Sequence, residues 1–159
     1  MASWHEIETA APEFAAAVRG YLDAHQHKTI ATLRKDGSPR ISGTEATFVD
    51  GDLWWGSMWR ARKALDLQRD PRFALHSGSD DPPAWKGDAK IAGRAVEVED
   101  DAAFRALVAA QGHEDADMGQ AHLFRADIDE VSLVQINEAG DELVIEVWTP
   151  SGGLRRIER

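Results

Sequence analysis

Short β-rich segments separated by tight-turn sequences constrain the fold of this chain more than any other feature. The segment at residues 29–34 is followed by Lys-Asp-Gly-Ser at 35–38, and the segment at 46–49 by Asp-Gly-Asp at 50–52. Glycine accepts positive φ at such turns, so each pattern predicts a β-hairpin. The other strand-like segments lie at 39–44, 53–57, 72–77, 88–98, 131–137 and 143–148, and Gly93 within 88–98 indicates a β-bulge. Strands joined by hairpins predict an antiparallel sheet closed or nearly closed into a barrel.

Helical periodicity occurs in only a few places. Phe14, Val18 and Leu22 recur at helical spacing after Pro12, which predicts one amphipathic N-terminal helix. Residues 61–69 read as a short helix with Ala61, Ala64 and Leu65 on one face, and residues 102–111 read as another. The helix at 61–69 stops before Asp70-Pro71, because the residue before a proline disfavours helix. The predicted fold class is therefore mainly β, a barrel of six or seven antiparallel strands with peripheral helices.

The length and composition are those of one ordinary globular domain. The chain has 159 residues, of which 43% are hydrophobic, and no cysteine. The lack of cysteine excludes disulfides, thiolate metal sites and cysteine nucleophiles, and it fits a cytoplasmic protein. We expect no signal peptide and no membrane span. We expect a single domain at 1–159, with a helix in 1–28, barrel strands and a phosphate-binding helix in 29–100, and a helix and final hairpin in 101–159.

Charge is distributed unevenly along the chain. The formal net charge is −10, which disfavours general nucleic-acid binding because phosphate neutralisation dominates that affinity. The densest basic stretch nevertheless contains Arg60, Arg62, Lys63, Arg69 and Arg72. A local cationic site on an acidic protein suits a small anionic ligand. The alternative is a solvated helix face.

The segment from Leu53 to Ala64 carries the strongest indication of a ligand site. A strand ends at Gly56-Ser57 and a helix begins near Ala61, so unpaired backbone N–H groups are expected there. Arg62 and Lys63 fall in the first turn of that helix, where the helix dipole does not favour cations. An anion between these cations and the free amides would explain their position, which favours a phosphate site. Arg40, on a neighbouring strand, would reach the same site or would be an ordinary surface arginine.

Tryptophan and histidine add weaker indications. Alternation places Trp54 and Trp55 on opposite faces of one strand, so only one of them can lie in a given core. His25 and His27 form one histidine group; His113 and His122 form another, which brackets Glu114, Asp115 and Asp117. Neither group has a zinc-site spacing, so we expect no metal. Acyl-transfer, Walker and dinucleotide-binding motifs are likewise missing from the sequence.

The order of these segments resembles a known family. The runs Thr-Ile-Ala-Thr-Leu-Arg-Lys-Asp-Gly-Ser-Pro-Arg-Ile from 29, Gly-Asp-Leu-Trp-Trp-Gly-Ser from 51 and Ala-Arg-Lys-Ala-Leu-Asp-Leu-Gln-Arg-Asp-Pro-Arg from 61 are similar to the pyridoxamine 5′-phosphate oxidase-like proteins, which include the flavin/deazaflavin-dependent oxidoreductases. This resemblance implies an FMN-binding split β-barrel. It also implies a homodimer with the cofactor in the groove between subunits.

The resemblance assigns cofactor contacts to particular positions. Arg40 would begin the strand that lines the cofactor, Gly56 and Ser57 would contact it, and Arg62 with Lys63 would clamp its phosphate. Asp88 aligns with a polar position near the flavin ring. The cofactor-binding residues expected on this basis are Arg40, Ile41, Ser42, Gly56, Ser57, Arg62, Lys63 and Asp88; no catalytic residue is assigned.

Two departures from the family narrow the expected function. Pyridoxamine phosphate oxidases place a substrate-binding lysine where this chain has Glu45, and they end in an Arg-x-His segment that nothing after Leu143 matches. We therefore expect an oxidoreductase that transfers a hydride between bound FMN, or alternatively coenzyme F420, and a small organic substrate other than vitamin B6 phosphate. The alternative is a non-catalytic flavin- or haem-binding protein or sensor on the same barrel. Neither nucleic acid nor a membrane is an expected partner.

Overall fold

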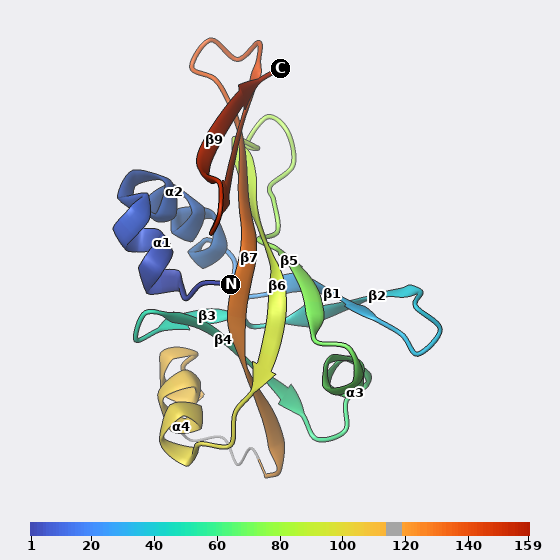
Figure 1. Ribbon diagram of the computed structural model, residues 1–159. Coiled ribbons are helices and arrows are strands. Elements are labelled where there is room, and N and C mark those ends of the chain that lie inside the picture. Colours follow the sequence, from blue (N-terminus) through green and yellow to red (C-terminus); the bar gives the residue numbers. More distant parts are fainter. Residues whose placement is uncertain (114–118) are drawn as a thin grey trace.

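Antiparallel strands dominate the computed structural model, which describes residues 1–113 and 119–159 (Figure 1). The strands are β1 (Lys28–Leu33), β2 (Pro39–Thr44), β3 (Thr47–Val49), β4 (Asp52–Met58), β5 (Arg72–His76), β6 (Gly87–Glu97), β7 (Ala121–Ile136), β8 (Leu143–Thr149) and β9 (Gly153–Glu158). They form one sheet in the order β2-β1-β5-β6-β7-β4-β3, with β8 beside β7 and β9 beside β8. The predicted fold class, a mainly β split barrel with peripheral helices, is confirmed.

The described residues contain nine strands rather than six or seven, and β7 begins earlier than the predicted residue 131. β7 pairs with β4 through its first part, with β6 through most of its length and with β8 through its last part. His122, Leu123 and Phe124 are buried in succession, so no alternation marks this part of the strand. Leu123 lies opposite Gly56, against which α4 side chains pack. A strand covered on both faces loses the period-2 signal that sequence reading needs.

The helices are α1 (Trp4–Ala10), α2 (Pro12–Asp23), α3 (Arg62–Arg69) and α4 (Asp101–Ala110). Two N-terminal helices stand where one was expected, because Ser3 and Glu6 form a capping box that starts α1 before Pro12 starts α2. Figure 1 shows α1 and α2 on one side of the long strands β6 and β7, with α3 on the other side. None of the helices in the described ranges has the length and apolar character needed to span a membrane.

Two predicted details of the strands are confirmed. Trp55 is fully buried and packs against Phe73 and Phe124, whereas Trp54 on the opposite face of β4 is half-buried. The register of β6 against β7 shifts between Ala92 and Gly93, which is the expected bulge. A Cβ atom at Gly93 would lie 2.0 Å from a β7 backbone oxygen, so only glycine fits this approach.

The buried face of α3 differs from the prediction. Ala64 and Leu67 are buried in the core, while Leu65 is half-buried and Gln68 is exposed. The helix begins at Arg62, and 3.6 residues per turn then place positions three apart on the inner face. Asp66, a carboxylate, is also buried on this helix.

Candidate functional site

The ends of β4 and β2 carry two buried hydroxyl groups. Ser57, near the end of β4, and Thr44, at the end of β2, are 7% and 4% exposed. Among the described residues, neither hydroxyl oxygen has a hydrogen-bond partner. The N-cap of α3, Ala61, supplies no side-chain hydrogen bond to the first turn of that helix in this structure. Buried polar groups are normally paired, so these groups mark a place for a ligand or ordered water.

Lys63 meets the two hydroxyl-bearing residues in one cavity. This cavity, which we term the lysine pocket, has a volume of about 340 Å³ and is lined by Gly43, Thr44, Glu45, Ser57, Lys63 and His113, together with His27, Gly56, Met58 and Gln111. The Lys63 ammonium donates a hydrogen bond of 2.6 Å to the Gly43 carbonyl. Burial lowers the pKa of Lys63. A desolvated cation beside unpaired hydroxyl donors favours an anion in the pocket.

Glu45 also lines the lysine pocket. His113 Nε2 lies 2.9 Å from its carboxylate and His27 Nε2 lies 3.7 Å from it. Gln111 donates to the Glu45 carbonyl, so the end of α4 is tied to the β2–β3 connection. The pocket therefore contains a cation at Lys63 and an imidazole–carboxylate pair at His113 and Glu45. Sequence reading considered Glu45 and His113 separately, because 68 positions separate them.

Arg40 and Arg62 line a different cavity. This second cavity, which we term the arginine groove, has a volume of about 610 Å³ and is lined by Arg34, Lys35, Arg40, Arg62, Asp66 and Arg69, with Asp36 and Leu65. Arg62 therefore faces the groove, although its neighbour Lys63 faces the lysine pocket. The predicted phosphate clamp is divided between two cavities.

Asp66 organises the arginine groove from its buried position. Its carboxylate accepts hydrogen bonds from Thr32 Oγ1 at 2.9 Å, Arg40 Nε at 2.7 Å and Arg69 Nη2 at 2.9 Å. Burial by itself would raise the pKa of Asp66, but the hydrogen bonds from Arg40, Arg69 and Thr32 outweigh it and the pKa lies below its ordinary value. Arg40 is thus held in place by a carboxylate. It uses only Nε for this contact.

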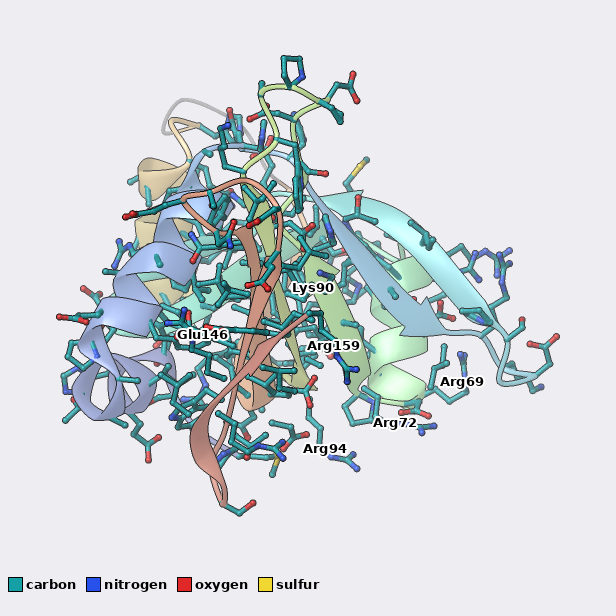
Figure 2. The ribbon with its side chains drawn as sticks, turned by 90° about the horizontal axis from the view of Figure 1, so that it is seen from above. Arg69, Arg72, Lys90, Arg94, Glu146 and Arg159 are labelled. Carbon is teal, nitrogen blue, oxygen red and sulfur yellow. The ribbon has the colours of Figure 1, made fainter. Side chains whose placement is uncertain are left out.

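The basic stretch recognised in the sequence does not form one cluster. Arg60 lies in the turn before α3, whereas Arg69 ends that helix and Arg72 begins β5. Figure 2 shows Arg69, Arg72 and Arg94 on one side of the molecule, and Arg72 pairs with Arg94 across β5 and β6. Arg72 binds Asp70 at 2.6 Å, and its hydrogen bonds lower the pKa of Asp70 to about 2. Arg72 is therefore an exposed residue whose guanidinium is paired with Asp70.

Three of the expected cofactor-binding residues lie outside both cavities. Ile41 points away from the barrel and is 74% exposed, and Ser42 is half-buried on β2. Asp88 on β6 forms an ion pair with Lys90 and lies 3.6 Å from His76 Nε2. The single chain therefore brings Gly56, Ser57 and Lys63 together, and separately Arg40 and Arg62.

A family model described as pyridoxamine 5′-phosphate oxidase matches residues 14–135, which is most of the chain and includes both cavities. The chain belongs to the pyridoxamine 5′-phosphate oxidase family. The resemblance inferred from the sequence is thereby confirmed. A search of curated proteins found no match to the sequence.

Solved structures share the fold of this pyridoxamine 5′-phosphate oxidase family member. Campylobacter jejuni ChuZ aligns with a TM-score of 0.74 at 11% identity, covering 92% of this chain and 63% of ChuZ. PhzG from Burkholderia lata 383, crystallised with tetrahydrophenazine-1-carboxylic acid, aligns with a TM-score of 0.63 at 13% identity, covering 98% and 92%. A heme binding protein from Mycobacterium smegmatis aligns with a TM-score of 0.62 at 18% identity, covering 89% and 57%. At these identities the likeness shows the fold.

Sequence reading missed two residues that shape the cavities. Thr44 follows Arg40 by four positions on β2, so strand alternation places both on the same face. Asp66 stands four positions after Arg62, between the buried Ala64 and Leu67, and a carboxylate there signals an internal partner. The expected histidine group at His113 and His122 divides, since His113 contacts Glu45 and His122 contacts Glu97. Glu114, Asp115 and Asp117 lie outside the described residues.

Proposed function

We propose that this protein is an FMN-dependent oxidoreductase that transfers a hydride between bound flavin and a small organic substrate. One observation carries the proposal: Ser57 and Thr44, whose buried hydroxyls have no partner among the described residues, line the same pocket as the half-buried Lys63. A phosphate monoester would accept hydrogen bonds from both hydroxyls and would neutralise Lys63. These donors fit the phosphate of a mononucleotide such as FMN.

The residues of the chain would bind and orient the cofactor. Lys63 and Ser57 would hold the phosphate, with Arg40 and Arg62 contributing positive charge from the adjacent arginine groove. Bound flavin supplies the hydride chemistry, so the protein needs no acid or base of its own for that transfer. We prefer FMN to F420 because the lysine pocket provides a site for one phosphate group, and FMN needs only that site. F420 remains the alternative cofactor.

We propose that two copies form the complete site. Ile41, Ala31, Ala74 and Ala92 are successive cross-strand neighbours on the outer face of β2, β1, β5 and β6. The other three residues of this row are alanines, so Ile41 is its one large side chain, and it is exposed. A second copy packed on it would cover Ile41, and Asp88 on the same outer face would approach the cofactor of the partner. This arrangement gives Ile41 and Asp88 a role that the single chain does not.

The substrate is proposed to differ from a vitamin B6 phosphate. Glu45, the partner of His113, stands at the position where the resemblance to the oxidases implies a lysine that binds the phosphate of the substrate. Glu45 lacks the positive charge with which such a lysine would bind a substrate phosphate. A non-catalytic haem-binding role is less well supported, because both ring nitrogens of His122 have partners, and His76 accepts a hydrogen bond at Nδ1 and lies 3.6 Å from Asp88 at Nε2.

Titration of purified protein with FMN, followed by flavin fluorescence, tests the proposal. The expected result is saturable binding of one FMN per chain and a flavin spectrum and mass in co-purified material. In the absence of oxygen and of added reductant, a substrate that donates a hydride should bleach the bound flavin. Binding of F420 but not FMN would show that F420 is the cofactor, and the proposed hydride transfer would stand. Failure to bind either flavin would overturn the proposed function, and bound flavin that no substrate oxidises or reduces would favour the non-catalytic alternative.

A further inference from the structure

His122 is a buried histidine whose two ring nitrogens both have partners. It lies on β7 and is 4% exposed. The backbone N–H of Arg60 donates to His122 Nε2 at 3.1 Å, and His122 Nδ1 lies 2.6 Å from the Glu97 carboxylate. Because a backbone N–H can only donate, Nε2 must be the unprotonated acceptor. The proton therefore resides on Nδ1 and is donated to Glu97, which defines one neutral tautomer.

The imidazole ring also has aromatic contacts. The Trp59 indole stacks on it with ring centroids 4.8 Å apart and an angle of 9° between the planes. Phe124 stacks with it at 6.1 Å. Since Trp59 and Arg60 are consecutive, His122 contacts the same turn through a hydrogen bond and through a stacked ring.

The turn that His122 contacts has a strained residue. Arg60 has φ of 56°, in the left-handed region that residues with a side chain rarely adopt. Such a conformation persists where its surroundings hold it, and these residues often lie at functional sites. Here the Arg60 N–H is bound by His122, and the Ala61 N–H donates to the Met58 carbonyl at 3.0 Å. The turn is therefore held at both amides.

This turn connects Ser57 to Lys63, two residues that line the lysine pocket. Ser57 precedes it on β4, and Lys63 follows it in the first turn of α3. Ser57 is also the direct cross-strand neighbour of His122. The distance and direction from the Ser57 hydroxyl to the Lys63 ammonium depend on the path of the backbone between them.

We propose that His122 is the positioning residue of this anion site. Its Nε2 acceptor holds Arg60 in the left-handed conformation, which directs the start of α3 and Lys63 towards Ser57. Glu97 acts through His122, because it fixes the proton on Nδ1 and so keeps Nε2 available as an acceptor. The inference rests on the proposed function, since it names the residue that shapes the proposed phosphate site.

Two substitutions at His122 separate hydrogen bonding from packing. His122→Phe keeps a flat ring against Trp59 but removes the acceptor, whereas His122→Gln keeps an acceptor near the position of Nε2. We expect His122→Phe to weaken FMN binding about tenfold, as one lost hydrogen bond typically does. We expect His122→Gln to stay within about threefold of the wild type. Equal losses in both variants would indicate a packing role and overturn the inference.

A rescue experiment and a spectrum complete the test. Arg60→Gly relieves the strain at φ of 56°, so adding it to His122→Phe is expected to restore part of the lost affinity. No rescue in a folded double variant would contradict the mechanism. In wild-type protein, ¹⁵N correlation spectra of the histidine rings should show His122 protonated on Nδ1, with coupling from Nε2 to the Arg60 amide; the opposite tautomer would overturn the inference even if His122→Phe does not fold. Absence of both FMN and F420 binding by the wild type would instead overturn the proposed function.

Discussion

Arg62 and Lys63 are consecutive residues at the start of α3, yet their side chains line different cavities. Successive positions on a helix differ in direction by about 100°. The barrel places β2 beside this end of the helix, with Thr44 at the lysine pocket and Arg40 at the arginine groove. Two cations that form one pair in the sequence therefore contribute unequally to any single ligand.

Replacing the two cations separately should reveal this inequality. We expect Lys63→Met to weaken FMN binding by about 2 kcal/mol, the range for a hydrogen bond to a charged group. Arg62→Met should weaken it by about 0.5 kcal/mol, because Arg62 acts across the boundary of the pocket. Isothermal titration of both variants measures the difference. Equal losses would place the phosphate between the two cavities, and unchanged affinity in both folded variants would contradict a phosphate site at α3.

Ser57→Ala should change stability and cofactor affinity in opposite directions. The Ser57 hydroxyl is buried without a partner among the described residues, so its removal should stabilise the cofactor-free protein by about 1 kcal/mol. The same substitution should weaken FMN binding, because the phosphate loses a donor. Chemical denaturation and FMN titration give the two quantities. Ser132→Ala, on the outer face of β7, is the matched control, and a loss of cofactor-free stability in Ser57→Ala would count against an unpaired hydroxyl.

FMN affinity should fall at alkaline pH. Burial lowers the pKa of Lys63 from its ordinary value of 10.5, so the ammonium loses its proton earlier than a solvated lysine. Over the same range the unfolded chain binds more protons than the folded one, and the free energy of unfolding of the cofactor-free protein should rise with pH. Titrations between about pH 8 and pH 10 measure the affinity. Lys63→Met should remove the dependence, whereas Lys86→Met should retain it; a flat wild-type profile would show that Lys63 does not bind the phosphate.

Asp66→Asn should destabilise the protein and alter its acid sensitivity. Asp66 accepts hydrogen bonds from Thr32, Arg40 and Arg69, and loss of its charge should cost about 2 to 3 kcal/mol. Because the folded pKa lies below the ordinary value of 3.8, this contribution is complete above that value and is lost as pH falls through the folded pKa. Denaturation at neutral and acidic pH measures both effects. A variant as stable as the wild type at neutral pH would show that the two arginines find other partners.

The glycine at the β6 bulge should not tolerate a side chain. Gly93→Ala would place a Cβ atom 2.0 Å from the Asp127 carbonyl oxygen, and backbone at that distance must move. We expect a loss of about 4 kcal/mol or a failure to fold. Gly43→Ala is the control, since nothing lies within 4 Å of the Cβ atom that alanine would add there and its φ is unstrained. Thermal unfolding compares the two, and equal midpoints would contradict the close approach at Gly93.

The sequence alone determined the elements whose signals are local. The turns at 35–38 and 50–52, the proline after α3 and the alternation around Trp54 and Trp55 predicted the hairpins, the end of that helix and the buried tryptophan, because φ preferences and side-chain period act over a few residues. The resemblance to a family also placed Gly56, Ser57 and Lys63 among the eight residues expected to bind the cofactor, and these three line one cavity.

Only the tertiary structure decided which side chains share a cavity. Arg40 meets Asp66 across 26 positions, Glu45 meets His113 across 68, and Arg60 meets His122 across 62. None of these pairs has a periodicity that a sequence can show, because each depends on how distant strands and helices come together when the barrel closes. The start of β7 was missed for the same reason, since its two faces are covered by different parts of the chain.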